Sequence, residues 1–284
     1  MLRELLRVPS GGTFDLASVD PRSTPGLPAK KGRSWARRKL DEGSADFERH
    51  QEMLYASAKA ADDRRRLLLV LQAMDCGGKD GTVRKVAGRF NPAGVSVVSF
   101  GPPTDEEKAH DFLWRIRRAL PAPGYVGVFN RSHYEDVLVV RVHGLVPPDV
   151  WGQRYDQINA FERELAADGL TIVKVMLHIS PQEQLERLRE RLEDPTKHWK
   201  YKPGDVDERH RWADYQAAYA DALARCSTDV APWYVVPADR KWYRDWAVAH
   251  LLRETLVDMH LSYPPPDFDI EAEKARLKTE QGTP

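Results

Sequence analysis

The stretch LQAMDCGGKDGT, residues 71–82, follows a short apolar run and contains a Gly-Gly-Lys triplet. In a phosphate-binding loop, glycines let backbone N–H groups face phosphate oxygens, and a lysine reaches the same anion from the start of a helix. The stretch departs from the usual pattern GxxxxGK[ST] twice, because Ala73 replaces the first glycine and Asp80 replaces the hydroxyl residue after Lys79. We interpret it as a phosphate loop. The alternative is a tight strand-to-helix turn that merely needs glycine.

One acidic residue inside the loop argues against that alternative. The carboxylate of Asp75 would repel bound phosphate unless a cation lay between them, so Asp75 predicts Mg²⁺. The helix that follows the loop adds a strip of cations. The residues expected to bind phosphate or polyphosphate here are Gly77, Gly78, Gly81, Thr82, Arg84, Lys85 and Arg89.

The composition limits the class of protein. With 284 residues, 42% hydrophobic and 30% charged, the chain is long enough for one large α/β domain or two small ones and is too apolar to be largely disordered. Lys and Arg balance Asp and Glu at 43 each, so no overall field draws the chain to nucleic acid or to a membrane. The two cysteines make neither a disulfide scaffold nor a zinc site. With no signal-peptide core and no apolar run near the ~18 residues of a membrane helix, we expect a cytoplasmic protein.

The chain divides into three parts. Residues 1–44 form a basic extension that Gly and Pro interrupt, with nine Lys or Arg against three Asp or Glu through Lys39. Such an arm is typical of a solvated tail or a packing strap. Residues 45–260 form the main domain, which opens with a helix at 47–63, and residues 261–284 form a C-terminal tail.

Five short apolar runs recur along the main domain, at residues 67–72, 95–100, 125–129, 171–178 and 233–236. Each is rich in β-branched or aromatic residues and is bounded by Gly, Pro or polar residues, as buried parallel strands are. Stretches with 3.6-residue periodicity separate most of them. This alternation predicts an α/β fold in three layers, with a five-stranded parallel sheet and helices on both of its faces.

The third run ends in VGVFNRSHYED, residues 126–136. Ligands bind at the carboxyl ends of parallel strands, so Arg131 is placed to neutralise a transferring phosphoryl group. A mononucleotide kinase usually has an acidic residue where this chain has Asn130, which leaves Glu135 or Asp136 to hold metal. The alternative for Arg131 is an ion pair with Asp136, and the alternative for His133 is a structural imidazole.

The stretch after the fourth run, PQEQLERLRERLEDPTKHWKYKPGD, is rich in cations. Arg187 and Arg191 share one helix face because they are four residues apart. Glutamates on the same helix can pair with these arginines, but they do not account for Lys197, Lys200 and Lys202 beyond the Asp-Pro break. The pattern predicts a helical lid at about 183–212 that closes over phosphates and excludes water.

Six segments together resemble the family-2 polyphosphate kinases. These segments are AMDCGGKDGTVRKV, FNPAGVSVVSF, HDFLWRIRRALPAPG, FNRSHYEDVLVVRVHG, EDPTKHWKYKPGD and APWYVVPADRKWYRDW, and the resemblance covers roughly residues 45–257. It implies a P-loop kinase-like fold with a lid, and transfer of phosphoryl groups between inorganic polyphosphate and nucleotides with Mg²⁺. Carried over by motif, Asp75 and Lys79 match the family's loop acid and lysine, and Arg131 matches its strand-end arginine. The family's lid cations correspond to Arg191, Lys197 and Lys200.

The NRSHYED version of the strand-end motif resembles the subgroup that phosphorylates both AMP and ADP. Many family members have aspartate at the position of Asn130 and asparagine at the position of Glu135. Glu135 therefore becomes the candidate for metal binding or nucleotide preference. Family members commonly assemble as dimers or tetramers, so the resemblance also implies a homo-oligomer.

These observations predict a kinase that transfers the terminal phosphate of polyphosphate to AMP, ADP or both, reversibly. The acceptors are adenine nucleotides, with guanine nucleotides left open. Asp75, Lys79 and Arg131 are the catalytic candidates, and Asp75 with Glu135 are the metal candidates. The lid candidates are Arg187, Arg191, Lys197 and Lys200. The alternatives are an ATP-dependent nucleoside or nucleotide kinase of the same fold and a non-catalytic polyphosphate-binding protein.

Overall fold

A computed structural model of the chain describes residues 1–280. Its centre is one parallel sheet in the order β2-β3-β1-β4-β5. The strands are β1 (Arg66–Ala73), β2 (Val95–Ser99), β3 (Val126–Asn130), β4 (Leu170–His178) and β5 (Trp233–Pro237). All five match the apolar runs of the sequence, so the expected five-stranded parallel sheet is confirmed.

The central strand, β1, is buried along its whole length because neighbouring strands and helices cover it from all sides. It pairs with β3 on one edge, where Leu71 lies opposite Asn130, and with β4 on the other, where Ala73 lies opposite Leu177. The carboxyl ends of β1 and β3 are therefore neighbours. This register brings the loop after β1 next to the strand-end arginine.

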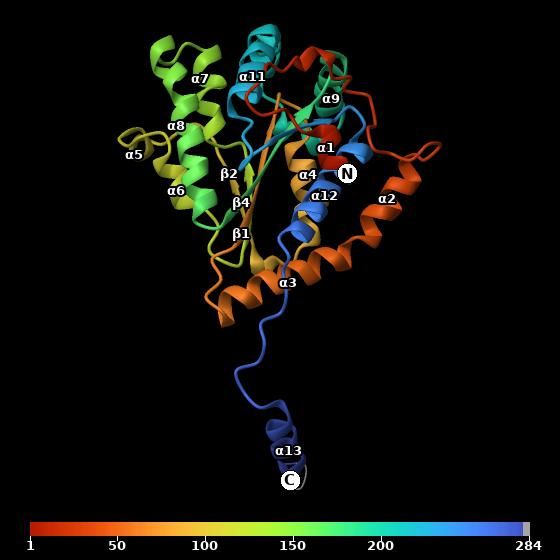
Figure 1. Ribbon diagram of the computed structural model, residues 1–284. Coiled ribbons are helices and arrows are strands. Elements are labelled where there is room, and N and C mark those ends of the chain that lie inside the picture. Colours follow the sequence, from red (N-terminus) through yellow and green to blue (C-terminus); the bar gives the residue numbers. More distant parts are fainter. Residues whose placement is uncertain (281–284) are drawn as a thin grey trace.

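Helices cover both faces of the sheet, as Figure 1 shows. On one face lie α4 (Lys79–Val86) and α12 (Lys241–Asp258), and on the other lie α6 (Trp114–Ala119) and α8 (Pro148–Ala167). The carboxyl ends of the strands carry α7 (Val139–Val142), α9 (Pro181–Glu193), α10 (Gly204–His210) and α11 (Trp212–Cys226), and α5 (Asp105–Lys108) follows β2. Short 3₁₀ turns complete the chain at η1 (Leu16–Ser18), η2 (Ala87–Arg89), η3 (Pro92–Gly94), η4 (His133–Asp136) and η5 (Pro195–Lys200).

The helix expected at 47–63 is α3 (Ser44–Ala60), which crosses the opposite end of the sheet in Figure 1. Phe47 and Leu54 of this helix are buried. Met53 and Ala58 are only partly buried. The helix starts earlier than expected because Gly43 ends the preceding helix and lets Ser44 begin the next one.

The basic N-terminal segment packs along the body of the protein as a strap. Leu2 and Leu6 of α1 (Leu2–Leu6) are buried, and Val8 donates a backbone hydrogen bond to Trp233 of β5. The helix α2 (Arg33–Glu42) lies against α12 and buries Ala36 and Leu40. A solvated tail is therefore not the conformation of this segment, although the domain division at residue 44 stays a prediction.

The C-terminal segment leaves the body after α12. Figure 1 shows an extended stretch that leads to α13 (Ile270–Glu280), which projects away from the sheet. None of the residues of α13 is buried. Residues 281–284 of the expected tail lie outside the described residues. Among residues 1–280, no helix has both the length and the apolar character that crossing a membrane requires.

Candidate active site

The loop after β1, residues 74–78, turns the chain from the sheet into α4. Cys76 and Gly78 take left-handed backbone conformations, with φ of 63° and 102°. A Cβ on Gly77 would lie 2.3 Å from the Cβ of Ala73, and one on Gly78 would lie 1.9 Å from Nη1 of Arg244. Close packing against Ala73 therefore requires glycine at position 77, and the left-handed backbone conformation favours glycine at position 78. A left-handed conformation at a non-glycine residue such as Cys76 is typical of functional loops that their surroundings hold in place.

Lys79 is the first residue of α4, and its ammonium group points back over the loop. Its Nζ donates a hydrogen bond to the carbonyl oxygen of Ala73 at 2.9 Å. Burial, followed by repulsion from Arg131, lowers the pKa of Lys79, while Asp75 opposes this shift. An anion placed against this ammonium would therefore bind in a poorly solvated environment, where charge interactions are strong.

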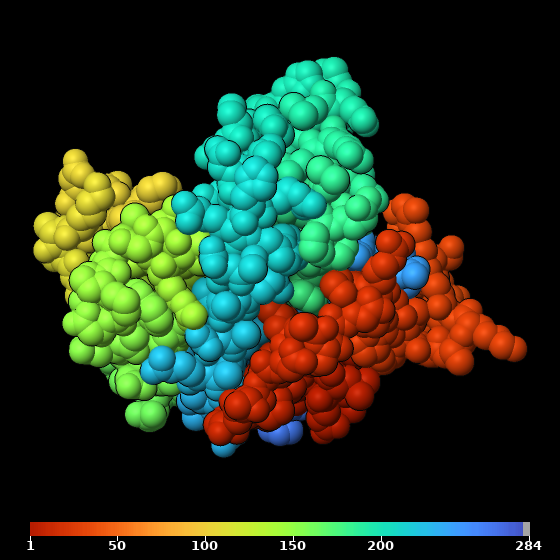
Figure 2. Space-filling view, turned by 90° about the horizontal axis from the view of Figure 1, so that it is seen from above, coloured from red at the N-terminus to blue at the C-terminus, as the bar shows by residue number. Residues whose placement is uncertain are grey.

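A cavity of about 890 Å³ lies over the loop at the carboxyl ends of the strands. Figure 2 views the molecule from this side and shows a hollow between the yellow segment after β2 and the teal lid segment, residues 183–212. Loop, strand end and lid all contribute to its lining. The sequence-predicted residues that line it are Asp75, Gly77, Gly78, Lys79, Gly81, Arg84, Arg131, Glu135, Arg187, Arg191, Lys197 and Lys200.

The other three predicted phosphate-binding residues lie outside this lining. Thr82 is fully buried, and its hydroxyl donates a hydrogen bond to the carbonyl oxygen of Gly78 at 3.2 Å. Lys85 and Arg89 line a neighbouring cavity instead. Their role in binding phosphate stays a prediction.

Arg131 follows the last residue of β3 in a left-handed conformation, with φ of 64°. Its Nη2 lies 3.4 Å from Oδ1 of Asp75. The expected alternative partner, Asp136, instead pairs with Arg154 at 3.0 Å, so that alternative is wrong. Burial works against the charge of Arg131, yet Glu135 and Asp75 raise its pKa above the usual arginine value. The guanidinium thus pairs with Asp75, and the charge of Glu135 favours its ionised form.

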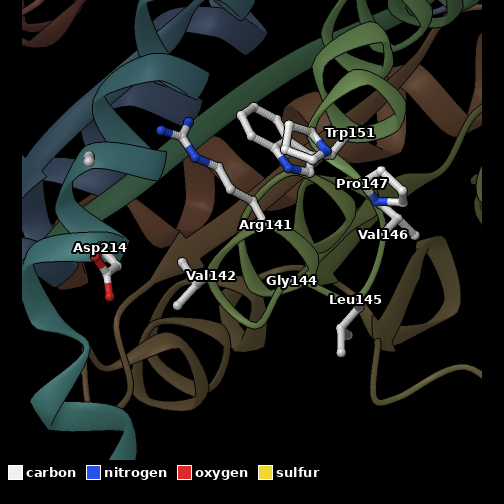
Figure 3. Close-up of a pocket in the computed structure, with 10 residues that line it drawn as sticks. Arg141, Val142, Gly144, Leu145, Val146, Pro147, Trp151 and Asp214 are labelled. Atoms are coloured by element: carbon white, nitrogen blue, oxygen red, sulfur yellow. The ribbon is translucent and has the colours of Figure 1, made fainter.

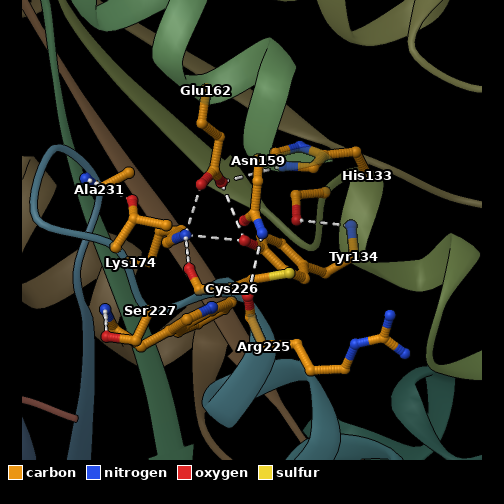
Figure 4. Close-up of polar contacts among 12 residues, drawn as sticks. His133, Tyr134, Asn159, Glu162, Lys174, Arg225, Cys226, Ser227 and Ala231 are labelled. Carbon is orange, nitrogen blue, oxygen red and sulfur yellow. Dashed lines mark hydrogen bonds and ion pairs between the residues drawn. The ribbon is translucent and has the colours of Figure 1, made fainter. Parts of the chain in front are cut away.

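A buried polar network fixes the strand-end turn that carries Arg131 and Glu135 (Figure 4). Nζ of Lys174 lies 2.5 Å from Oε2 of Glu162 and donates to the hydroxyl of Tyr134 at 2.7 Å. Tyr134 in turn donates to Oε1 of Glu162, and His133 contacts the same oxygen at 3.2 Å. His133 is buried and does not line the cavity, which agrees with its interpretation as a structural imidazole.

The lid cations differ in what they contact. Arg187 is buried, and it donates to the carbonyl oxygens of Cys76 at 2.8 Å and Ala238 at 2.6 Å. It therefore ties the lid helix to the loop instead of being a free cation. Arg191 connects two helices of the lid, because it donates a hydrogen bond from α9 to Oδ2 of Asp205 in α10 at 3.1 Å.

The two lid lysines lie nearer to solvent. Lys197 pairs with Asp194 of the same turn at 2.9 Å. Lys200 reaches across the cavity to Oδ2 of Asp80 at 3.1 Å, and the amide of Asn130 donates to the other oxygen of that carboxylate at 2.9 Å. The lid and α4 are thus linked through Asp80.

A sequence model of one family, Polyphosphate kinase 2 (PPK2), matches residues 37–263, a range that contains every cavity residue named above. The chain belongs to this family. The match confirms the resemblance that the six sequence motifs indicated. It also begins inside α2, so the polyphosphate kinase 2 region includes part of the N-terminal strap.

Relatives and solved structures agree with this assignment. An AMP/ADP-polyphosphate phosphotransferase from Meiothermus ruber is 49% identical over 93% of this chain and 97% of its own length. An ADP-polyphosphate phosphotransferase from Rhodopseudomonas palustris is 43% identical over 75% of this chain and 76% of its own. The crystal structure of polyphosphate kinase 2 from Arthrobacter aurescens matches with a TM-score of 0.94 and 50% identity, over 98% of this chain and 96% of that chain. The predicted P-loop kinase-like fold is confirmed.

The carboxylates of the cavity fit a divalent cation. Asp75 and Glu135 both line it, and both act electrostatically on Arg131 and Lys79. Among residues 1–280, no group of three or more His, Cys, Asp or Glu side chains is arranged to hold a metal alone. A divalent cation held by two carboxylates can take its other oxygens from water and from substrate phosphates.

Sequence reasoning missed two residues of this polyphosphate kinase 2 site. Asp80 was noted only as a departure from the loop pattern, whereas it accepts hydrogen bonds from Lys200 and Asn130. Arg244 lies against Gly78 and Gly81 and pairs with Asp245 at 2.6 Å. The signal for Arg244 was present in the segment APWYVVPADRKWYRDW, but its spacing alone gives no reason to place it beside the loop.

A separate hollow of about 660 Å³ lies among α7, α8 and α11 (Figure 3). Arg141 lies over the ring of Trp151 at 4.7 Å and pairs with Asp221 at 2.5 Å. None of the predicted phosphate, metal or lid residues lines this hollow. The cavity at the strand ends is therefore the candidate active site.

Proposed function

We propose that this chain transfers the terminal phosphoryl group of inorganic polyphosphate to AMP and ADP, reversibly and with Mg²⁺. The observation that carries the proposal is the lining of one cavity, which contains the loop lysine, the strand-end arginine and the lid lysines together with the two metal candidates, Asp75 and Glu135. The names of the relatives from Meiothermus ruber and Rhodopseudomonas palustris support the donor and the acceptors.

The proposed reaction depends on positioning and charge neutralisation. An oxygen of the nucleotide's terminal phosphate attacks the end phosphorus of the polyphosphate in line, and the shortened polyphosphate leaves with the electron pair of the broken P–O bond. Lys79 and Arg131 stabilise the negative charge on the transferring group. Closure of the lid excludes water, which would otherwise compete with the nucleotide as acceptor.

Asp75 and Glu135 are the residues that would hold Mg²⁺ in this site. When bound, Mg²⁺ supplies positive charge that offsets the charge of donor and acceptor phosphates. Asp75 has a second role, because its contact with Arg131 orients the guanidinium group. Neutralising Asp75 therefore affects both the metal and the arginine.

Group transfer through a covalent enzyme intermediate is not part of the proposal. The loop contains one thiol, that of Cys76, and burial raises its pKa to about 11. At neutral pH the thiol stays protonated and is a poor nucleophile. Direct attack by the acceptor phosphate needs no such group.

The experiment that tests the proposal compares donors. The protein is incubated with AMP and Mg²⁺ together with either long-chain polyphosphate or ATP, and ADP and ATP are measured by chromatography. We expect products with polyphosphate. Consumption of ATP alone would favour the ATP-dependent kinase. Binding of polyphosphate without turnover of AMP, ADP or a guanine nucleotide would favour a non-catalytic binding protein.

Three further predictions accompany this function. The resemblance supports a homo-oligomer, either a dimer or a tetramer, which sedimentation of the purified protein tests. A cytoplasmic location is tested by fractionating cells. Acceptance of guanine nucleotides is tested by replacing AMP and ADP with GMP and GDP in the donor experiment.

A further inference from the structure

A second cavity of about 750 Å³ lies beside the first, between the N-terminal strap and the start of α12. The two cavities share Gly81, Arg84, Lys241 and Arg244 in their linings, so they adjoin each other. Charged residues dominate the lining of the second cavity. Its cations are Arg33, Arg37, Arg84, Lys85, Arg89, Arg240, Lys241 and Arg244, and its acids are Asp41, Glu183, Asp239 and Asp245.

The acids of this second cavity already have partners. Asp41 pairs with Arg89 at 2.6 Å, and Asp245 pairs with Arg244 at 2.6 Å. Glu183 pairs with Arg187 at 2.7 Å. Asp239 accepts two hydrogen bonds from Ser180 at 2.8 Å each. Three of the four carboxylates therefore already have an arginine as counterion, and Asp239 is held by Ser180.

In the part of the chain that the structure describes, five cations are left without a counterion, and one of them, Arg240, donates only to the carbonyl oxygen of Arg22 at 2.9 Å. Within residues 1–280, the side chains of Arg33, Arg37, Arg84 and Lys85 form no ion pair and no hydrogen bond. Their positive charges accumulate on one wall and at the junction with the first cavity. Such an accumulation attracts an anion that has several charges along its length.

The strap presents its two arginines in a fixed position. Arg33 and Arg37 lie four residues apart and so share one face of α2, where two like charges repel each other. The helix is anchored to the body of the protein, because Ala36 is buried and Trp35 packs on Trp246 with 5.8 Å between ring centroids. The helix therefore holds the two charges together, although their repulsion disfavours this arrangement.

We infer that the second cavity binds the distal part of the polyphosphate donor, and that Arg33 and Arg37 make the enzyme favour long chains. This inference rests on the proposed function. If the reacting end of the donor lies at Lys79, the rest of the chain must leave the first cavity. Arg84 and Arg244, which line both cavities, give it a cationic route to the strap. Polyphosphate suits this route because each unit carries negative charge and no base or side group.

The kinetic test removes the two strap charges. The variant Arg33→Ala/Arg37→Ala is compared with Arg38→Ala/Lys39→Ala, which removes two charges from the same helix. Arg38 and Lys39 do not line the second cavity, and both pair with Glu42. Each protein phosphorylates AMP with tripolyphosphate or with long-chain polyphosphate as donor.

We expect the KM for long-chain polyphosphate to rise about tenfold in the Arg33→Ala/Arg37→Ala variant, because two exposed charge contacts are lost. The KM for tripolyphosphate stays within about twofold, since a three-phosphate donor ends inside the first cavity. The control variant changes neither value. An equal rise for both donors, or no rise for either, would overturn the inference.

A binding measurement separates this inference from the proposed function. The dissociation constant of long-chain polyphosphate is measured at several salt concentrations without nucleotide. By analogy with nucleic acids, losing two phosphate contacts lowers the slope of log Kd against log salt by about 1.5. This measurement reports on the strap even if the wild-type protein transfers no phosphate. An unchanged slope would contradict a site for polyphosphate. So would single-stranded RNA that binds as tightly as polyphosphate and loses its binding in the Arg33→Ala/Arg37→Ala variant.

Discussion

The buried network beneath η4 and the cavity at the strand ends both contain charged side chains. They differ in whether the protein itself supplies the counterions of their cations. In the network, Lys174 and Glu162 are fully buried and neutralise each other at 2.5 Å. In the cavity, Arg84 and Lys202 form no ion pair within residues 1–280. The network is complete in itself and holds the backbone in place. The cavity needs an anion from outside, which is what a phosphate-transfer site requires.

The largest effect on stability is expected when the network loses its cation. Lys174→Met leaves Glu162 buried without a counterion, so the free energy of unfolding should fall by about 3–5 kcal/mol. Lys202→Met in the cavity is the matched control and should change it by less than about 0.5 kcal/mol. Chemical denaturation measures both. Similar losses of stability for the two variants would contradict the idea that only the network cation neutralises a buried charge.

The ion pair of Lys174 with Glu162 also makes the free energy of unfolding depend on pH. Burial opposes ionisation of Glu162, but Lys174 and His133 lower its pKa below the usual value. In the wild-type protein this contribution to stability is present above the unfolded-state pKa of about 4.3 and is lost as pH falls through the folded-state value. Without Lys174 the carboxyl protonates more readily. The stability difference between wild type and Lys174→Met should therefore narrow as pH falls.

Neutralising the loop acid is expected to impair catalysis without unfolding the protein. Asp75→Asn removes a metal candidate and the partner of Arg131, so kcat should fall by at least about 100-fold. Added Mg²⁺ should restore part of the loss. Asp156→Asn, an exposed acid on α8 away from the cavity, is the control and should keep the wild-type rate. A wild-type kcat for Asp75→Asn would remove this residue from the catalytic set.

A smaller effect is expected at the contact between lid and α4. Burial by itself would raise the pKa of Asp80, but hydrogen bonds from Lys200 and Asn130 outweigh burial and lower this pKa below its usual value. The contact is therefore present above the unfolded-state pKa of about 3.9 and is lost as pH falls through the folded-state value. Lys200→Ala should lower kcat/KM for polyphosphate about tenfold while changing stability by less than about 1 kcal/mol. Lys278→Ala on α13 serves as control, and an equal change in both variants would contradict a role for the lid.

The smallest expected change concerns the choice of acceptor. Glu135 lines the cavity beside Arg131, where a carboxylate repels a nucleotide with more phosphate charge. Glu135→Asn should shift the ratio of kcat/KM values for AMP and ADP by a few-fold, about what one exposed charge contributes. The measurement uses the two acceptors separately at saturating polyphosphate. An unchanged ratio would remove Glu135 from acceptor selection.

The sequence was sufficient for the fold because its signals are local. Each strand is a short apolar run between polar or Gly and Pro residues, and the loop after β1 carries its glycines and lysine within twelve residues. The predicted cavity residues converge because parallel strands place their carboxyl ends along one edge. Twelve of the fifteen predicted site residues line the cavity. Of the exceptions, Thr82 is buried within α4, and Lys85 and Arg89 lie at the end of α4 and in η2.

Contacts between distant segments were not predictable from the same signals. Lys174 lies within an apolar strand, and only the packing of α8 shows that Glu162 is its partner. Arg187 pairs with Glu183 on its own helix, but the carbonyl oxygens that hold this arginine in a buried position leave no mark in a sequence. The strap was ambiguous since its buried leucines are few and separated by Gly and Pro. Tertiary packing decides each of these cases.

The most direct test of polyphosphate-driven transfer at this cavity is turnover by Lys79→Met. Wild-type and variant proteins are incubated with long-chain polyphosphate, AMP and Mg²⁺, and the rates of ADP and ATP formation are measured beside a thermal unfolding curve. The account predicts that the variant keeps the wild-type unfolding curve and loses about 100- to 1,000-fold in kcat. A folded variant that forms ADP at more than about a tenth of the wild-type rate would contradict it.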